Sequence, residues 1–66
     1  MIATVFIEGR EITAEIDEAG AIIPTHVDGR KIDYRTENDD YMFVDLYDDE
    51  IVEAVKDWIE NERNGG

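Results

Sequence analysis

The sequence predicts an α+β fold, a small antiparallel β-meander of four or five strands packed by one C-terminal α-helix. Three observations predict it. β-Branched and alternating apolar residues fill most of residues 2–47, glycine-containing turn signals divide that stretch, and apolar residues at helical spacing follow only after it. The 66 residues are 42% apolar, which is sufficient for one small domain with a modest core and too little for a deep substrate cleft.

Residues 2–17 predict the first β-hairpin. Residues 2–7 read IATVFI and place apolar side chains on both faces, as in a central strand. Gly9 supplies the turn. The next strand alternates strictly, with Ile12, Ala14 and Ile16 facing the core and Glu11, Thr13, Glu15 and Asp17 facing solvent.

Residues 21–36 predict a second hairpin. Pro24 interrupts its first strand, and because proline has no N–H to donate it indicates a sheet edge or a bulge. Asp28-Gly29 is a strong signal for a hairpin turn. Residues 31–36 then alternate in polarity and predict the returning strand.

Residues 41–47 (YMFVDLY) predict the last strand, after a polar turn at residues 36–40. A strand has a side-chain period of two, so its two faces differ. The predicted core face holds Met42, Val44 and Leu46, and the predicted outer face holds Tyr41, Phe43, Asp45 and Tyr47.

Residues 48–62 predict the helix. Asp48 suits the N-cap, and the positive end of the helix dipole stabilises the acids at the positions that follow. The sequence Asn64-Gly65-Gly66 predicts the helix stop and a frayed tail over residues 63–66. The apolar stripe consists of Ile51, Val52, Ala54, Val55, Trp58 and Ile59, all assigned to the core.

The chain carries 18 acidic and 6 basic side chains, a formal charge of −12. Cysteine is absent, so neither a disulfide nor a thiolate zinc site is expected. No apolar run approaches the ~20 residues of a membrane span, and the first residues lack a signal-peptide pattern. We therefore expect a cytoplasmic protein, in the host cytoplasm if a phage encodes it, with no membrane partner.

The charge is unevenly distributed along the chain. Residues 1–36 hold seven acids and four bases, a balance of −3, whereas residues 37–66 hold eleven acids and two bases, a balance of −9. Two plain explanations are solubility, for which a charge of magnitude ~2–8 suffices, and a halophilic origin. The third is a basic partner, because such a surface repels nucleic acid and attracts proteins that bind nucleic acid.

The charge density of the predicted helix can be compared with that of DNA. Residues 48–62 hold seven acids and one base over ~22 Å, about half the charge density of duplex DNA. A protein with this surface occludes a nucleic-acid-binding site by replacing phosphates with carboxylates. The predicted partner-binding set combines the helix, the last strand, the turn before it and the wet face of the first hairpin: Glu11, Glu15, Asp17, Glu37, Asp39, Asp40, Tyr41, Phe43, Asp45, Tyr47, Asp48, Asp49, Glu50, Glu53, Asp57 and Glu60.

Other chemistry has little support in the sequence. His26 is the only histidine, with no serine or cysteine to activate and no second nitrogen ligand for zinc. The acidic clusters do not follow the spacing of a calcium loop. We expect no enzyme activity, no cofactor and no dedicated metal site.

Two further features have alternative interpretations. The aromatic residues Tyr41, Phe43 and Tyr47 form either the apolar part of an interface or a second small cluster with Phe6 or Tyr34. The terminal diglycine is shared with ubiquitin-like modifiers and sulfur carriers, but there it extends from a strand, whereas here it follows the helix.

Residues 46–55 (LYDDEIVEAV), an acidic helix after two hairpins, resemble small accessory proteins of bacteriophages and mobile elements. Some acidic members of that group are anti-CRISPR proteins or nuclease inhibitors that act as DNA mimics. The resemblance covers size, composition and element order, without a diagnostic motif. It implies an inhibitor that occludes a basic partner, and the alternative is a phage-type structural or assembly protein that binds a partner subunit through the aromatic last strand.

Overall fold

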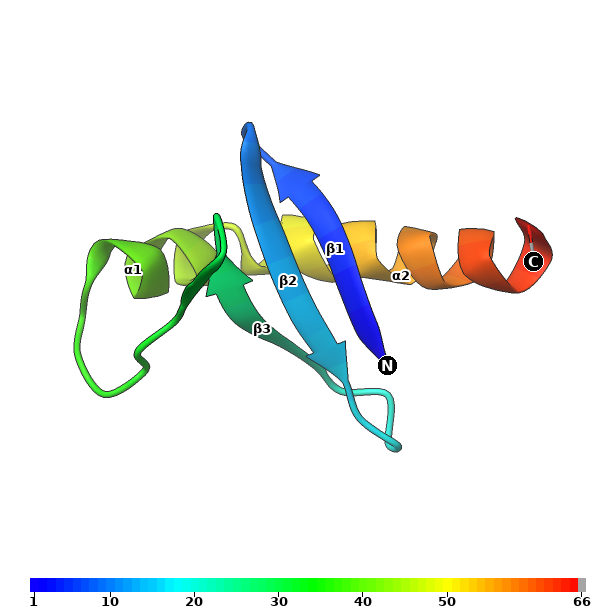
Figure 1. Ribbon diagram of the computed structural model, residues 1–66, viewed down its shortest axis with the longest axis horizontal. Coiled ribbons are helices and arrows are strands. Elements are labelled where there is room, and N and C mark those ends of the chain that lie inside the picture. The colour runs from blue at the N-terminus through cyan, green and yellow to red at the C-terminus, as the bar shows by residue number, and fades with distance from the viewer. Residues whose placement is uncertain (66) are drawn as a thin grey trace.

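Four antiparallel strands form an open sheet, and two helices run behind it (Figure 1). The computed structural model describes residues 1–65. The strand order β1-β2-β3-β4 follows the chain, so the α+β class and the meander are confirmed, with four strands and two helices where one helix was predicted. The elements are β1 (Ile2–Ile7), β2 (Arg10–Ile16), β3 (Ile22–Val27), β4 (Arg30–Lys31), α1 (Asp39–Leu46) and α2 (Asp48–Gly65).

The β1–β2 and β3–β4 hairpins each turn through two residues with positive φ. Glu8 and Gly9 have φ of 51° and 78°, and Asp28 and Gly29 have φ of 52° and 82°. Two consecutive positive φ angles match the twist of antiparallel strands, and glycine adopts them without steric cost. The predicted turns at Gly9 and at Asp28-Gly29 are confirmed.

Of the two alternatives predicted at Pro24, a sheet edge or a bulge, a bulge is present. Thr13 of β2 pairs with His26, but the next residue, Ala14, pairs with Pro24, which leaves Thr25 as the extra residue of β3. The Thr25 hydroxyl donates to the Thr13 carbonyl across the irregularity, at 3.2 Å. Since β4 is only two residues long, proline occupies a position where β3 has no partner on its far side.

Side chains of alternating positions build the core between the sheet and the helices. In β1, Ala3, Val5 and Ile7 are buried, whereas Ile2 and Phe6 on the other face are 57% and 69% exposed. The prediction that this strand is central is wrong, because β1 lies at the edge of the sheet and its outer face is uncovered. Apolar residues on both faces of a strand therefore do not establish burial on both faces.

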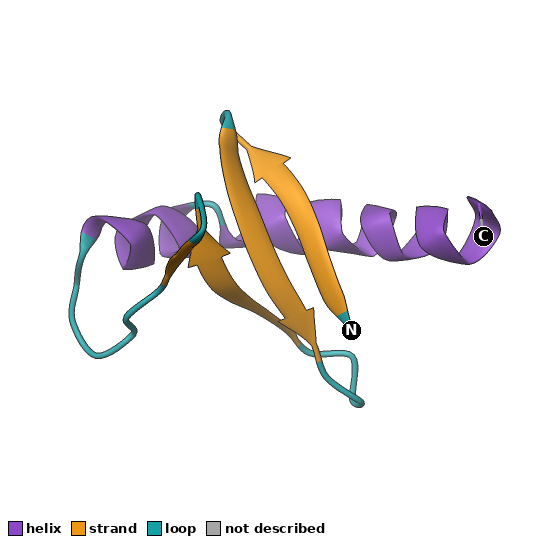
Figure 2. Ribbon diagram, in the orientation of Figure 1, coloured by secondary structure: helices purple, strands orange, loops and turns teal. Residues whose placement is uncertain are grey.

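The long helix α2 closes the core. Ile51 and Val55 are fully buried, while Trp58 and Ile59 pack against the core from a half-buried position. The predicted stripe is confirmed for five of its six residues, with Ala54 also packed against the core, whereas Val52 does not belong to it. Figure 2 shows α2 continuing past the edge of the sheet beyond β1, so its last turns lie in solvent, as the exposed residues 60–65 indicate.

The predicted strand over residues 31–36 is wrong beyond Lys31. Asp33 ends the extended chain, because its Oδ1 accepts hydrogen bonds from the Arg35 backbone N–H at 2.9 Å and from the Arg35 Nε at 3.0 Å. Asn38 then clasps the loop, donating from Nδ2 to the Asp33 carbonyl at 2.8 Å. Such local side-chain hydrogen bonds compete with strand pairing.

The predicted strand over residues 41–47 is also wrong, since these residues belong mostly to α1. The Asn38 side chain is the N-cap and accepts from the Tyr41 backbone N–H at 2.9 Å, and Asp39 and Asp40 occupy the first turn. A cap followed by two acids favours a helix start, and here it outweighs the strand propensity of the aromatic residues. This cap residue, Asn38, lies in the sequence three residues before the predicted strand at 41–47.

Because α1 is a helix with 3.6 residues per turn, different side chains face the core than in the predicted strand. Val44 is buried as predicted, but Met42 and Leu46, also predicted to face the core, are 57% and 76% exposed. The aromatic residues predicted to face outward pack against the core: Tyr41, Phe43 and Tyr47. Residues i and i+2 share a face in a strand and not in a helix, which explains the correction.

The second helix begins at Asp48, as predicted, but directly after another helix. Tyr47 is the C-cap of α1, and its carbonyl accepts from the Ile51 N–H at 2.9 Å. Residues 63–65, predicted to be a frayed tail, are helical, while Gly66 lies outside the described residues.

Candidate functional site

Nine exposed acidic residues gather on the two helices. Because α1 and α2 follow one another behind the sheet (Figure 1), acids predicted to be divided between a strand and a helix lie along one helical layer. We call this set the acidic ridge: Asp39, Asp45, Asp48, Asp49, Glu50, Glu53, Asp57, Glu60 and Glu62. Glu37 is exposed in the loop just before it.

The ridge is comparable in length and charge to a strand of DNA. Residues 39–62 advance about 35 Å at 1.5 Å per residue, close to the longest dimension of the molecule, 37 Å. They contain ten acids and one base, Lys56. The same length of duplex carries about 20 phosphates, or about 10 on one strand. The two helices therefore carry about as many negative charges as one strand of the duplex.

Little within the chain compensates these charges. Among residues 1–65, the ion pairs are Arg30–Asp40 at 3.0 Å and Arg35–Asp33 at 3.0 Å. The Asp40 side chain is only 17% exposed, and its contact raises the pKa of the Arg30 guanidinium. Asp40 therefore has a structural partner and stands apart from the ridge, although the sequence placed it in the binding set.

Like charges are stacked along α2. Asp49, Glu53 and Asp57 follow one another at intervals of four residues, which places them on the same side of the helix. Each such like-charge pair destabilises a helix by roughly 0.2–0.5 kcal/mol. Lys56, three residues after Glu53 and four before Glu60, offsets part of this repulsion, and the remaining crowding of acids opposes folding.

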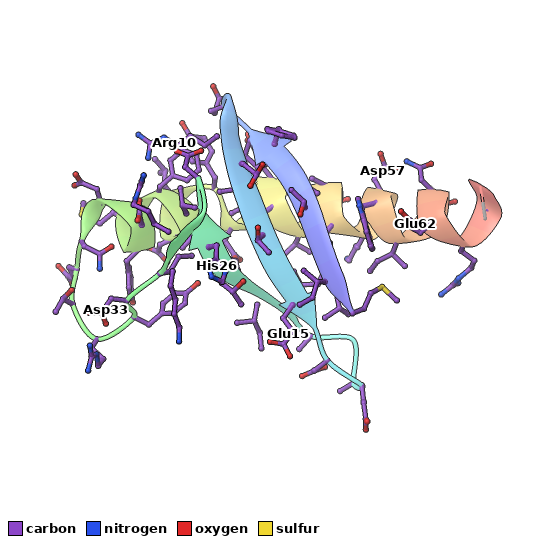
Figure 3. All side chains as sticks on the ribbon, viewed as in Figure 1. Arg10, Glu15, His26, Asp33, Asp57 and Glu62 are labelled. Carbon is purple, nitrogen blue, oxygen red and sulfur yellow. The ribbon has the colours of Figure 1, made fainter. Side chains whose placement is uncertain are left out.

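The acids predicted on the first hairpin lie elsewhere. Glu11 and Glu15 belong to β2 on the face of the sheet away from the helices, where Glu15 is labelled in Figure 3, whereas Asp57 and Glu62 stand on α2. Asp17 has a local role, since its Oδ1 accepts from the backbone N–H groups of Ala19 and Ala21 at 2.9 and 2.8 Å. The structure does not bring these three acids to the ridge.

The aromatic residues form two contacts beside the ridge. The rings of Tyr34 and Tyr41 meet edge-on with centroids 5.5 Å apart, in agreement with the alternative of a second cluster. Phe43 and Tyr47 lie 4.8 Å apart, and the Arg10 guanidinium sits 4.8 Å above the Phe43 ring. Tyr41, Phe43 and Tyr47 are partly buried against the core, whereas Tyr34 is 47% exposed.

A pocket of about 340 Å³ opens where β3 approaches the junction of the helices, and strand-based reasoning could not find it. The Tyr34 hydroxyl donates to the Pro24 carbonyl at 2.6 Å across one side of it. Burial raises the pKa of Tyr34, and the neighbouring Asp48 carboxylate and Tyr41 raise it further. The lining residues are Ile22, Ile23, Pro24, Tyr34, Tyr41, Val44, Asp45 and Asp48.

Other functional signals are few. His26 lies on β3, with its Nδ1 2.9 Å from the Thr25 hydroxyl. Within residues 1–65, no three His, Cys, Asp or Glu side chains converge as metal ligands would, and neither helix has an apolar stretch long enough to cross a bilayer. Comparison with protein-family models, curated proteins and solved structures gave no match.

Proposed function

We propose that this protein is a non-enzymatic inhibitor that occludes a basic, nucleic-acid-binding partner by DNA mimicry. The observation that supports this most directly is the acidic ridge, nine exposed carboxylates along about 35 Å of helix without an ion partner in the described chain. A surface of this kind attracts a cationic groove over distances of a Debye length, about 8 Å at physiological salt. Bound there, it excludes nucleic acid from the same groove.

The energetic cost of the ridge supports a role beyond solubility. Solubility is served by charges placed anywhere on the surface, including far from one another. The acids on α2 instead repeat at four-residue intervals, where they repel each other. A binding role accounts for both the number of charges and their placement.

The test is retention of partners from a nuclease-treated bacterial lysate on the immobilised protein. We expect retained proteins to elute between about 50 and about 200 mM salt, because each displaced phosphate contact makes binding salt-dependent. The eluted fraction should bind a labelled DNA duplex, and adding free protein should abolish that binding. Retention that is unchanged across this salt range contradicts the proposal.

Two triple variants with equal net charge separate the ridge from charge in general. Glu53→Lys, Asp57→Lys and Glu60→Lys reverse the ridge, whereas Glu8→Lys, Glu15→Lys and Glu18→Lys reverse acids away from the helices. Each triple changes the net charge from −12 to −6. We expect only the first triple to lose the partner, and equal losses would assign the effect to net charge.

A second candidate is an assembly or structural accessory protein. The strand that the sequence offered for this role is absent, but Met42 and Leu46 are exposed on α1 beside Arg10, along a groove of about 450 Å³. Exposed apolar residues of this kind favour a protein contact. If this function applies, Leu46→Glu abolishes partner binding while reversal of the ridge has little effect.

A further inference from the structure

The pocket at the helix junction combines two aromatic side chains, Tyr34 and Tyr41, with two carboxylates of the acidic ridge, Asp45 and Asp48. It measures about 340 Å³, near the lower end of ligand pockets, which run from about 300 to 1,000 Å³. Its apolar side comes from Pro24, Tyr34 and Tyr41, and its rim carries Asp45 and Asp48. This size suits one long side chain better than a large ligand.

The apolar walls are fixed before any ligand arrives. The Tyr34 hydroxyl bonds the Pro24 carbonyl at 2.6 Å, and the Tyr34 ring meets Tyr41 edge-on at 5.5 Å. Tyr41 is held in turn by the helix cap, where its backbone N–H donates to Asn38 at 2.9 Å. A preformed pocket binds with a smaller loss of conformational entropy.

The two carboxylates that line the pocket form no ion pair within residues 1–65, although Arg10 lines the adjoining groove together with Asp45. Asp45 lies near the C-terminal end of α1, where the helix dipole disfavours negative charge and where no basic residue is present. Asp48 follows three positions later at the start of α2. In the described part of the chain neither residue has an ion pair, so a positive group placed between them gains attraction from both.

We propose that this pocket receives one arginine side chain of the partner. A guanidinium stacks on aromatic rings and donates to carboxylates in a planar fork, which matches tyrosine walls and an acidic rim. The molecule already uses this contact once, at Arg10 over Phe43. The inference rests on the proposed function only in assigning the arginine to the basic partner.

The probe is capped arginine, N-acetyl-arginine N-methylamide, titrated into the ¹⁵N-labelled protein. We expect saturable shifts of the amides of Ile23, Tyr34, Tyr41 and Asp45. The neutral capped citrulline has nearly the same shape and should bind at least about tenfold more weakly, since it lacks the charge. Equal shifts with both probes, or shifts spread along α2 without saturation, would overturn the proposal.

Matched variants locate the site. Asp48→Asn and Asp45→Asn should each weaken capped arginine about tenfold, the size of one charge-assisted contact. Asp49→Asn is the control, because it removes the same charge from the next residue, which does not line the pocket. If Asp49→Asn weakens the probe as much as Asp48→Asn does, diffuse charge explains the binding and the pocket proposal is wrong.

The two proposals can fail separately. Capped arginine that saturates the pocket while no lysate protein is retained supports the pocket and contradicts the DNA-mimic function. Conversely, a partner that is lost when the ridge is reversed but binds Asp45→Asn/Asp48→Asn as tightly as Asp49→Asn/Glu50→Gln supports the function and contradicts the pocket. Circular dichroism of each variant verifies that the helices are retained.

Discussion

The outward faces of the two layers carry charge in different ways. On the sheet, each acid of β2 stands opposite an uncharged residue, Glu11 opposite Phe6 and Glu15 opposite Ile2. On the helices, acids are neighbours of other acids at three- and four-residue intervals. The sheet face thus mixes apolar and charged groups, whereas the helix face concentrates one sign.

The two faces therefore differ in how much their acidic residues lower the stability of the fold. An exposed acid on the open sheet face that stands opposite apolar residues, such as Glu15, changes stability little because it is hydrated. Crowded acids on a helix repel, and repulsion near the surface persists within the ~8 Å Debye length. The helix face is therefore where a functional role for the acidity is expected, and four predictions test the comparison.

The largest effect is expected where the two layers meet. Ile51 of α2 is fully buried, so Ile51→Ala should lower the free energy of unfolding by about 2–5 kcal/mol. A 66-residue domain has a total stability of only about 3–10 kcal/mol, so this single change removes much of it. Urea unfolding followed by circular dichroism measures the loss.

Ile2→Ala is the matched control for that prediction. Ile2 is 57% exposed on the open sheet face, and its truncation should cost about 0.5 kcal/mol or less. Equal losses from Ile51→Ala and Ile2→Ala would mean that the outer sheet face is covered in solution, contrary to the comparison.

The next largest effect is expected at the helix start. Asn38→Ala removes the cap that accepts from the Tyr41 N–H and should cost about 1 kcal/mol. Asn38→Asp keeps a cap acceptor but loses the Nδ2 donor to the Asp33 carbonyl. If the cap contact dominates, Asn38→Asp lowers the thermal stability less than Asn38→Ala does. Equal losses of stability would assign the effect to the hydrogen bond from Asn38 Nδ2 to the Asp33 carbonyl.

A smaller effect of opposite sign tests the repulsion directly. Glu53 has an acid four residues away on both sides, Asp49 and Asp57. Glu53→Gln removes these two repulsive pairs and one attractive pair with Lys56, three residues on, so it should raise the free energy of unfolding by about 0.2–0.5 kcal/mol at low salt. Glu15→Gln removes the same charge from the sheet face and should change stability little.

The same two variants should also be compared at high salt. The gain from Glu53→Gln should shrink at about 1 M salt, where the Debye length is about 3 Å. If Glu53→Gln and Glu15→Gln have equal effects at low salt, the two faces do not differ in electrostatic cost and the comparison fails.

The hairpins were predictable because their signals are local. Strict alternation in β2 fixes its faces, and Asp28-Gly29 fixes a turn in which both residues need positive φ. The missing N–H of Pro24 indicated a sheet edge or a bulge, and a bulge is found beside it. Neighbouring residues suffice for each of these inferences, and α2 was predictable from its apolar stripe for the same reason.

The strands predicted over residues 32–36 and 41–47 are wrong because competing local signals meet there. Their β-branched and aromatic residues fit a strand, but Asp33 and Asn38 bond the backbone around them and start a helix. The candidate site changed as a result, since Asp45 moved onto the helix layer and the pocket beside Tyr34 became visible only in three dimensions. The acidic helix itself was predictable from composition and spacing.

The smallest effect is expected at Asp33, an acid with a fixed cation partner. Hydrogen bonds from the Arg35 side chain, and secondarily from its backbone, lower the pKa of Asp33 below its ordinary value of 3.8. A lowered pKa means that the carboxylate stabilises this loop above pH 3.8 and that the contribution is lost as the pH falls through the lowered value. Arg35→Gln should move the Asp33 midpoint upward, toward 3.8, in an NMR titration of its carboxyl carbon. An unmoved midpoint would show that the contact with Arg35 does not persist in solution, and Asp33 would then resemble the unpaired acids of the ridge.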